Sequence, residues 1–368
     1  MYLSRRSVIC GGAVAAFGAT FAQATEKCPG VNPATGVRPA LALPEKVPHL
    51  PEARPVPAHW RQTALEIIAL FESGKRNIED AYGNVSATDV VSLGYLQWNH
   101  NSSSIYSTLL KDGGPDFVAA APPSIRADID RLIKASANPS RRADALRVLE
   151  SWRISGQLKP SIRSDVSRWL KSPPLRSRQD ALIDNELTQA LRYADAWQRD
   201  MGLSTEGDAP KRAFYTFVDL LIFNGADMAG LWVDHVKAFR TKFSSGVEML
   251  DHISQWVDAC RQFTFSGRVF AAKGDYTPDY TQLYRRKETT IAIKEWRRLA
   301  LSSDARLNED ALNLIAFGYL RALRSKGTDR PNGFHGVFQL DVFNRRGMMA
   351  TGIGVQNGDT APSVLFEL

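Results

Sequence analysis

Apolar residues between Trp60 and Glu72 recur at the three- and four-residue spacing of a single helix face. This spacing predicts an amphipathic helix that buries one side. Gly74 follows directly and is typical of a helix end. The residues of the apolar face are Trp60, Ala64, Ile67, Ile68 and Phe71. The helix therefore carries Glu72 in its last turn.

The pattern changes between Asn77 and Asn99. Two short stretches, Tyr82–Val85 and Val90–Leu96, are rich in strand-forming residues and are separated by a polar segment from Ser86 to Asp89. We expect a small β hairpin beside the first helix.

Helical spacing returns after residue 101 and continues through most of the chain. Expected helices cover residues 102–111, 123–136, 141–154, 160–171, 177–199, 210–223, 226–240, 245–262, 288–301 and 307–325. The segment 333–355 differs, because Asn344-Arg345-Arg346-Gly347 is typical of a turn, and there we expect a hairpin. The pattern predicts an α+β fold that is mainly α.

The first 24 residues are typical of a signal peptide. Arg5 and Arg6 precede an apolar run from Val8 to Ala22, and Ala22-Gln23-Ala24 is a small-x-small cleavage signal. The run is short for a membrane span. We expect a periplasmic or secreted protein with no stable membrane span after cleavage.

Four segments follow from these patterns. Residues 1–24 are the signal peptide, and residues 25–58 contain eight prolines, which predict an extended linker or a strap over the domain surface. Residues 59–330 form the main domain, and residues 331–368 form the C-terminal hairpin and tail.

The chain is basic, with 46 Lys and Arg against 39 Asp and Glu, a net charge of +7. This balance favours anionic partners, although an ordinary Arg-rich surface explains it equally well. No Lys/Arg block or zinc-finger spacing indicates nucleic-acid binding, and we expect no metal and no cofactor. The mature cysteines, Cys28 and Cys260, are compatible with a disulfide or with two free thiols.

Glu72 is the candidate for acid chemistry. A carboxyl group at the end of an apolar helix, partly buried against Phe71, would favour its neutral form, as a general acid requires. Glycoside hydrolysis by this route needs a second carboxylate across the scissile bond. Asp89, in the turn before Ser92, and Asp80 are the nearby candidates.

These residues resemble the lysozyme-like superfamily. Lytic transglycosylases have a similar Glu-Ser pair and a later Gly-x-x-Gln, which match Glu72-Ser73, Gly94 and Gln97. The likeness is closer to chitosanase-like and peptidoglycan-associated bacterial proteins. It is carried by Phe71-Glu72-Ser73, Tyr82-Gly83-Asn84-Val85 and Ser92-Leu93-Gly94-Tyr95-Leu96-Gln97-Trp98-Asn99, and more thinly by Val218–Gly225 and Arg285–Ala292. Where that family has Asp-Gly-x-Gly, this chain has Asp89-Val90-Val91.

The resemblance implies a lysozyme-like catalytic domain over residues 59–330, with Glu72 and Asp89 as catalytic residues and a small β hairpin beside the catalytic helix. Ser92 would hold a water molecule, Trp98 would stack on a sugar ring, and Arg286 would pair with an acidic residue behind the cleft. Tyr82, Asn84, Gln97 and Asn99 would contact the sugar. Each of these side chains also has a purely structural interpretation.

The implied function is cleavage of β-1,4 bonds between amino sugars. Peptidoglycan is the favoured substrate because it is largely anionic, whereas a basic protein repels the polycation chitosan. Three alternatives remain: a lytic transglycosylase, a chitosanase, and a catalytically silent wall-binding protein, which the shortened turn before Ser92 keeps open. Protein partners are not indicated.

Overall fold

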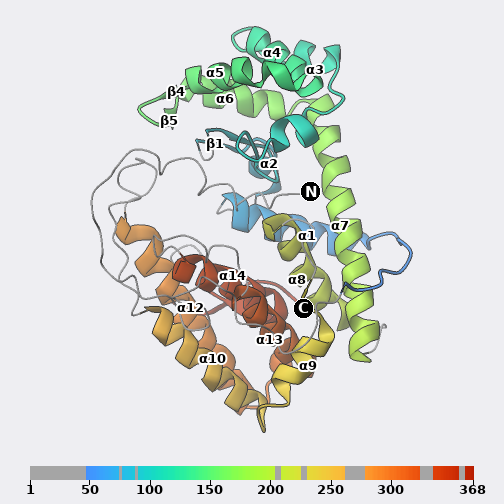
Figure 1. Ribbon diagram of the computed structural model, residues 1–368, viewed down its shortest axis with the longest axis vertical. Helices are drawn as coiled ribbons and strands as arrows, with labels where there is room; N and C mark the ends of the chain where they lie inside the picture. Colours follow the sequence, from blue (N-terminus) through green and yellow to red (C-terminus); the bar gives the residue numbers. More distant parts are fainter. Residues whose placement is uncertain are drawn as a thin grey trace.

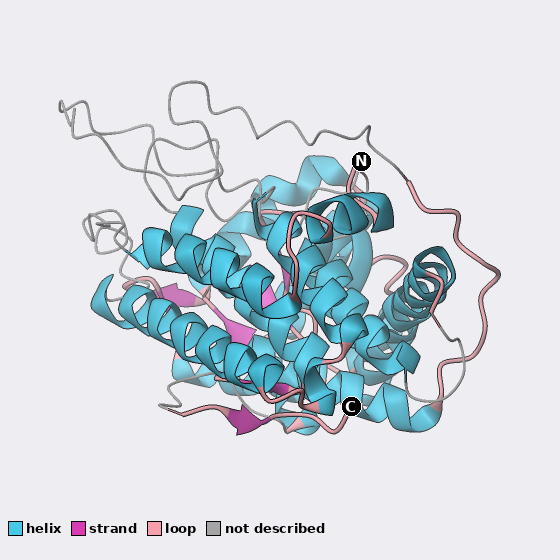
Figure 2. Ribbon diagram, turned by 90° about the horizontal axis from the view of Figure 1, so that it is seen from below, coloured by secondary structure: helices cyan, strands magenta, loops and turns pink. Residues whose placement is uncertain are grey.

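The computed structural model describes residues 47–73, 77–87, 90–203, 209–224, 230–261, 278–323, 335–355 and 361–368. This part of the chain is mainly helical, as the spacing predicts, and its strands are only two residues long (Figure 2). The expected signal peptide, Asp89 and most of the Pro-rich segment lie outside the described residues.

The first helix and the small β element lie next to each other in sequence. α1 (Ala58–Ser73) is followed by α2 (Ile78–Tyr82), which Asn77 caps by accepting hydrogen bonds from the backbone N–H groups of Glu79 and Asp80. A three-stranded antiparallel sheet comes next, with the strand order β1-β2-β3. Its strands are β1 (Val85–Ser86), β2 (Ser92–Leu93) and β3 (Trp98–Asn99).

This region differs from the expected hairpin in two ways. Tyr82 ends a helix instead of starting a strand, because the capped turn at Asn77 begins α2. The stretch from Val90 to Leu96 forms only one two-residue strand. The chain turns after it at Gly94, whose φ of 71° is one that glycine adopts readily.

The helices beyond the sheet form two groups (Figure 1). The upper group lies with the sheet, and the lower group contains both α8 and the end of the chain. The upper elements are η1 (Ile105–Leu109), α3 (Pro115–Ala119), α4 (Arg126–Ala137), η2 (Pro139–Arg141), α5 (Arg142–Ser151), β4 (Arg153–Ile154), β5 (Gln157–Leu158) and α6 (Pro160–Leu170). The lower elements are α8 (Ala209–Asn224), α9 (Val233–Arg240), α10 (Gly246–Arg261), α12 (Pro278–Leu301), η3 (Ala305–Leu307), α13 (Glu309–Leu323), α14 (His335–Thr351), β6 (Ile353–Gly354) and β7 (Ser363–Val364).

One long helix runs alongside both groups. α7 (Pro173–Met201) has 29 residues, which at 1.5 Å per residue is a rod of about 43 Å. Prolines at its start have no N–H group to satisfy, and Gly202 ends it in the left-handed conformation. α7 therefore links the two groups of helices (Figure 1).

The predicted hairpin turning at residues 344–347 is wrong, because these residues lie in the helix α14. The antiparallel pairing in the C-terminal segment joins β6 to β7 instead. The residues 344–347, which are typical of a turn, lie within α14 and pack against other parts of the fold. A Cβ added to Gly347 would come within 2.0–2.6 Å of the Trp296 ring, and the Asn344 side chain donates to the carbonyl of Val355 at 3.1 Å. Gly347 is a site of close helix contact, and the polar residues beside it are buried.

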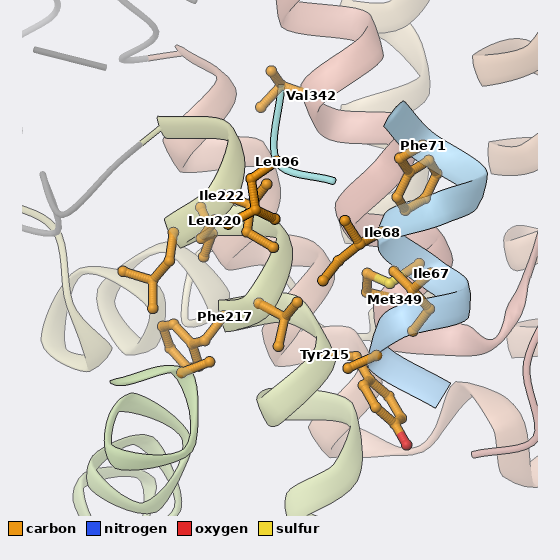
Figure 3. Packing of buried hydrophobic residues seen from close by; sticks show 14 of the residues in the cluster. Ile67, Ile68, Phe71, Leu96, Tyr215, Phe217, Leu220, Ile222, Val342 and Met349 are labelled. Carbon is orange, nitrogen blue, oxygen red and sulfur yellow. The ribbon is translucent and has the colours of Figure 1, made fainter. Parts of the chain in front are cut away.

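α1 is built into the lower group through its apolar face. Ile67 and Ile68 lie among side chains of α8 and α14, in the same buried cluster as Leu96 from the turn between β2 and β3 (Figure 3). This packing places the end of α1 where the sheet meets the lower helices.

The described end of the Pro-rich segment, residues 47–57, is irregular and lies against α7. Arg54 forms a two-bonded ion pair with Asp195, at 2.7 and 2.8 Å. Arg192 and Arg199 of α7 donate to the carbonyl oxygens of Pro51 and His49. No helix of the described residues is long and apolar enough to cross a membrane.

Candidate functional site

Glu72 lies in the last turn of α1, and its side chain is 8 % exposed. The backbone carbonyl of Glu72 accepts a hydrogen bond from the Asn84 side chain at 3.4 Å. Asn84 directly precedes β1, so this bond ties the end of the helix to the start of the sheet. The carboxyl group is therefore held at a junction, largely shielded from water.

The Glu72 carboxylate faces a guanidinium group. Arg345 Nη2 lies 3.6 Å from Glu72 Oε1, and the Arg345 side chain is 4 % exposed. The guanidinium carbon also lies 4.3 Å from the centre of the Phe71 ring, in cation–π contact. Phe71 is buried, and the same buried guanidinium contacts both its ring and the Glu72 carboxyl group.

Asp219 of α8 fixes this cation. Arg345 Nε donates to Asp219 Oδ1 at 2.7 Å, and Nη2 lies 2.5 Å from the same oxygen. Burial alone would lower the pKa of Arg345, but the carboxylates of Asp219, Glu72 and Asp341 outweigh it and raise the pKa. Arg345 therefore stays charged, with its orientation set by Asp219 more than by Glu72.

A second arginine lies behind the first. Arg346 is fully buried, and its Nε lies 3.9 Å from Asp219 Oδ2. Burial lowers the pKa of Arg346 to about 9, although the Asp219 carboxylate acts in the opposite direction. Its guanidinium makes no hydrogen bond with the described residues. The site thus places two adjacent cations of α14 around one carboxylate of α8.

This ion cluster was not predicted from the sequence. Asp219 is the single acidic residue in an otherwise apolar stretch of α8, and Arg345 and Arg346 are followed by the apolar residues Met348 and Met349. A charged residue inside an apolar helical pattern signals a buried ion pair. That signal was available for Asp219, but the expected turn at 344–347 concealed its partners.

Tyr82 is a structural residue in this fold. Its ring is 1 % exposed and packs edge-on against Tyr95 at 4.7 Å, and its hydroxyl donates to Asp180. The Arg176 guanidinium lies over the ring, 3.4 Å from its centre. Burial, followed by the bond to Asp180, raises the pKa of Tyr82.

The predicted sugar contacts around β2 and β3 are also mostly internal. Trp98 is completely buried, so neither face of its ring is open to solvent. Asn99 is buried and accepts a hydrogen bond from the Ser102 backbone at 2.8 Å. Gln97 bonds to Ser86 and to the carbonyl of Gly94. Ser92 is 3 % exposed within the sheet.

Of the remaining predicted residues, Asp80 alone has a side chain among those that the structure describes. Asp80 is on α2, about half exposed, with Lys171 Nζ 3.9 Å from its carboxylate. Arg286 belongs to α12, but its side chain lies outside the described residues, as do Asp89 and the side chains of both mature cysteines. Of the predicted site residues, Glu72 and Asn84 lie together in the structure. Asn84 is linked to Glu72 by the hydrogen bond to its backbone carbonyl.

The chain matches no protein-family model, no curated protein and no solved structure. Its resemblance to lysozyme-like proteins therefore rests on the motif residues alone. Among the described residues, no three His, Cys, Asp or Glu side chains group closely enough to hold a metal ion. The chemistry available at the site is that of a shielded carboxyl group beside a fixed cation.

Proposed function

We propose that the protein is an exported glycoside hydrolase that cleaves β-1,4 bonds between amino sugars, with Glu72 as the general acid. One observation carries this proposal: a nearly buried glutamate ends the first helix beside the small sheet, and Arg345 faces it at 3.6 Å. A carboxyl group fixed in this way can be aimed at one oxygen of a bound sugar chain.

Two opposing effects act on the Glu72 proton. Burial of the side chain favours the neutral acid, whereas the positive charge of Arg345 favours the carboxylate. Asp219 takes the two short contacts of Arg345, at 2.5 and 2.7 Å, and it also lies near Arg346. Glu72 is left with the longer ion contact of 3.6 Å, which positions the carboxyl group.

In the proposed reaction, the Glu72 carboxyl proton moves to the glycosidic oxygen as the bond to the anomeric carbon breaks. Asp89 takes a proton from water, and the water oxygen bonds to the anomeric carbon from the opposite face. An inverting enzyme of this kind requires about 6.5–9.5 Å between the two carboxyl groups. Arg345 and Asp219 are positioning residues, because they act through Glu72.

Peptidoglycan is the proposed substrate, since it is an anionic polymer and the chain is basic. The test is to incubate purified protein with peptidoglycan sacculi and separately with chitosan. Release of soluble fragments with reducing ends from sacculi is the expected result. Products ending in 1,6-anhydro sugars would show a lytic transglycosylase. Faster cleavage of chitosan would contradict the substrate, and binding without cleavage would contradict the enzyme.

The second carboxylate is tested by Asp89→Asn. An inverting hydrolase should lose most of its rate, since the substitution removes the general base. The products that it still releases should have reducing ends. Asp80→Asn tests the other candidate carboxylate, which pairs with Lys171, the residue directly after α6. Equal activity of Asp89→Asn and the unaltered protein would exclude Asp89 as the base.

A further inference from the structure

The positive charge of this protein is concentrated in one part of the fold. Residues 115–171, which form α3 to α6, contain 11 Lys and Arg but only 6 Asp and Glu, a surplus of five. The whole chain has a surplus of seven. Most of the net charge therefore belongs to the end of the upper group that lies away from α14 (Figure 1).

A groove of about 450 Å³ lies within this charged region, along α4 and α5. We call it the α4–α5 groove. Three arginines line it: Arg131 from α4, Arg141 from η2 and Arg147 from α5. Asp144, Val148 and Ser151 complete the lining. The groove thus presents three guanidinium groups and one carboxylate.

The three arginines are available to an incoming anion. The Arg131 and Arg147 side chains are 62 % and 71 % exposed. Arg147 pairs with Asp144, and Arg131 has only a long contact of 3.8 Å with Asp128. Arg141 is exposed and forms no ion pair or hydrogen bond through its side chain with the described residues. Exposed ion pairs of this kind are weak, so an anionic group of a polymer can replace the carboxylate partner at little cost in free energy.

Guanidinium groups bind carboxylate and phosphate groups with two parallel hydrogen bonds. Several of them along one groove suit a polymer that repeats its anionic group. A single small anion would use only one or two of the three. The geometry therefore points to an extended polyanion.

Nucleic acid is the less suitable polyanion. Proteins that bind single strands stack bases on exposed aromatic rings, and no Trp, Tyr or Phe in the described α3–α6 region is exposed. Trp152 and Trp169 are buried, and their indole N–H groups donate to Asp128 and to the carbonyl of Phe117. The region offers charge without a stacking surface.

We propose that the α4–α5 groove binds the carboxylate groups of peptidoglycan, and so anchors the protein to the polymer away from Glu72. This inference rests on the proposed function for its choice of polymer. It adds a second binding surface, whose role is attachment to the wall.

The test is sedimentation of the full chain with purified sacculi at low and high salt. The variant Arg131→Gln/Arg141→Gln/Arg147→Gln should bind about tenfold more weakly at low salt, and the difference should shrink at high salt. The matched control is Arg297→Gln/Arg298→Gln/Arg306→Gln, which removes three exposed, ion-paired arginines of α12 and η3. It should bind within about threefold of the unaltered protein.

Sacculi whose carboxyl groups have been amidated provide the second probe, and duplex DNA the third. Weak binding to amidated sacculi supports carboxylate recognition. Equal losses in both triple variants would show a general charge effect and overturn the groove. Tighter binding to DNA than to sacculi would overturn the proposed polymer.

Hydrolysis of a short soluble fragment of the polymer separates this inference from the proposed function. The groove variant should cleave the fragment at the rate of the unaltered protein while losing attachment to sacculi. A chain that attaches through the groove but cleaves nothing would contradict the proposed function alone. A groove variant that keeps full attachment would contradict this inference alone.

Discussion

Arg345 connects Glu72 to Asp219, so that residues of α1, α8 and α14 share one buried ion cluster. The guanidinium lies 3.6 Å from Glu72 and 2.5 Å from Asp219. This cluster anchors the last turn of α1 to the lower helices at Glu72, the proposed general acid.

Replacing Arg345 with Met should destabilise the protein by about 3 kcal/mol, since it leaves the Asp219 and Glu72 carboxylates buried without their shared cation. Urea unfolding followed by circular dichroism measures this change. Arg54→Met removes the exposed pair with Asp195 and should cost less than about 1 kcal/mol. Similar losses in the two variants would show that the buried cluster contributes no more than a surface pair.

Asp310 should make stability depend on pH in the direction opposite to most aspartates. Burial raises its pKa to about 6, although Arg212 acts in the opposite direction. The folded state therefore binds the proton more tightly than the unfolded chain, and stability falls as the pH rises from about 4 to about 6. The loss contributed by this group is about 3 kcal/mol at most.

Asp310→Asn tests this pH dependence, because the amide is neutral at every pH. The variant should melt at a higher temperature than the unaltered protein at pH 7.5, and the difference should be much smaller at pH 4. Melting curves at the two pH values give the comparison. A difference that does not change with pH would show that Asp310 does not titrate as the structure requires.

Gly347→Ala tests the helical packing of α14 against Trp296. The added methyl group would come within 2.6 Å of three ring carbons, so the variant should lose about 1–3 kcal/mol of stability. Gly114→Ala is the control, since no atom lies within 4 Å of its added Cβ. Its stability should change by less than about 0.5 kcal/mol. An unchanged unfolding midpoint for Gly347→Ala would argue against this contact.

The parts of the fold that sequence predicted well are those with sustained periodicity. The predicted ends of six helices agree with the observed ends to within a few residues. These helices are α1, α4, α6, α8, α10 and α13. α2 was missed because five residues show too little periodicity, and a cap at Asn77 defines it instead. α14 was missed because its glycine and polar residues serve contacts with other helices, which no local pattern reveals.

The candidate site divides in the same way. Glu72 was identifiable because its position at a helix end before a β element is local information. Trp98 and Tyr82 carried a motif, but both are buried, and Tyr82 bonds to Gln179 and Asp180, which lie far along the chain. Asp219 and Arg345 are far apart in the sequence and meet only in the folded protein. The sequence could indicate that Asp219 has a buried cationic partner, but not that the partner is Arg345.

Glu72→Gln tests the proposed general acid most directly, because it keeps the shape of the side chain and removes the transferable proton. The rate of reducing-end release from sacculi should fall by about 10²–10⁴-fold, with unchanged circular dichroism. Glu66→Gln, the same substitution on the same helix, where Glu66 accepts a hydrogen bond from Gln62, should retain the rate of the unaltered protein. Cleavage by Glu72→Gln at that rate would contradict the assignment of Glu72 as the general acid.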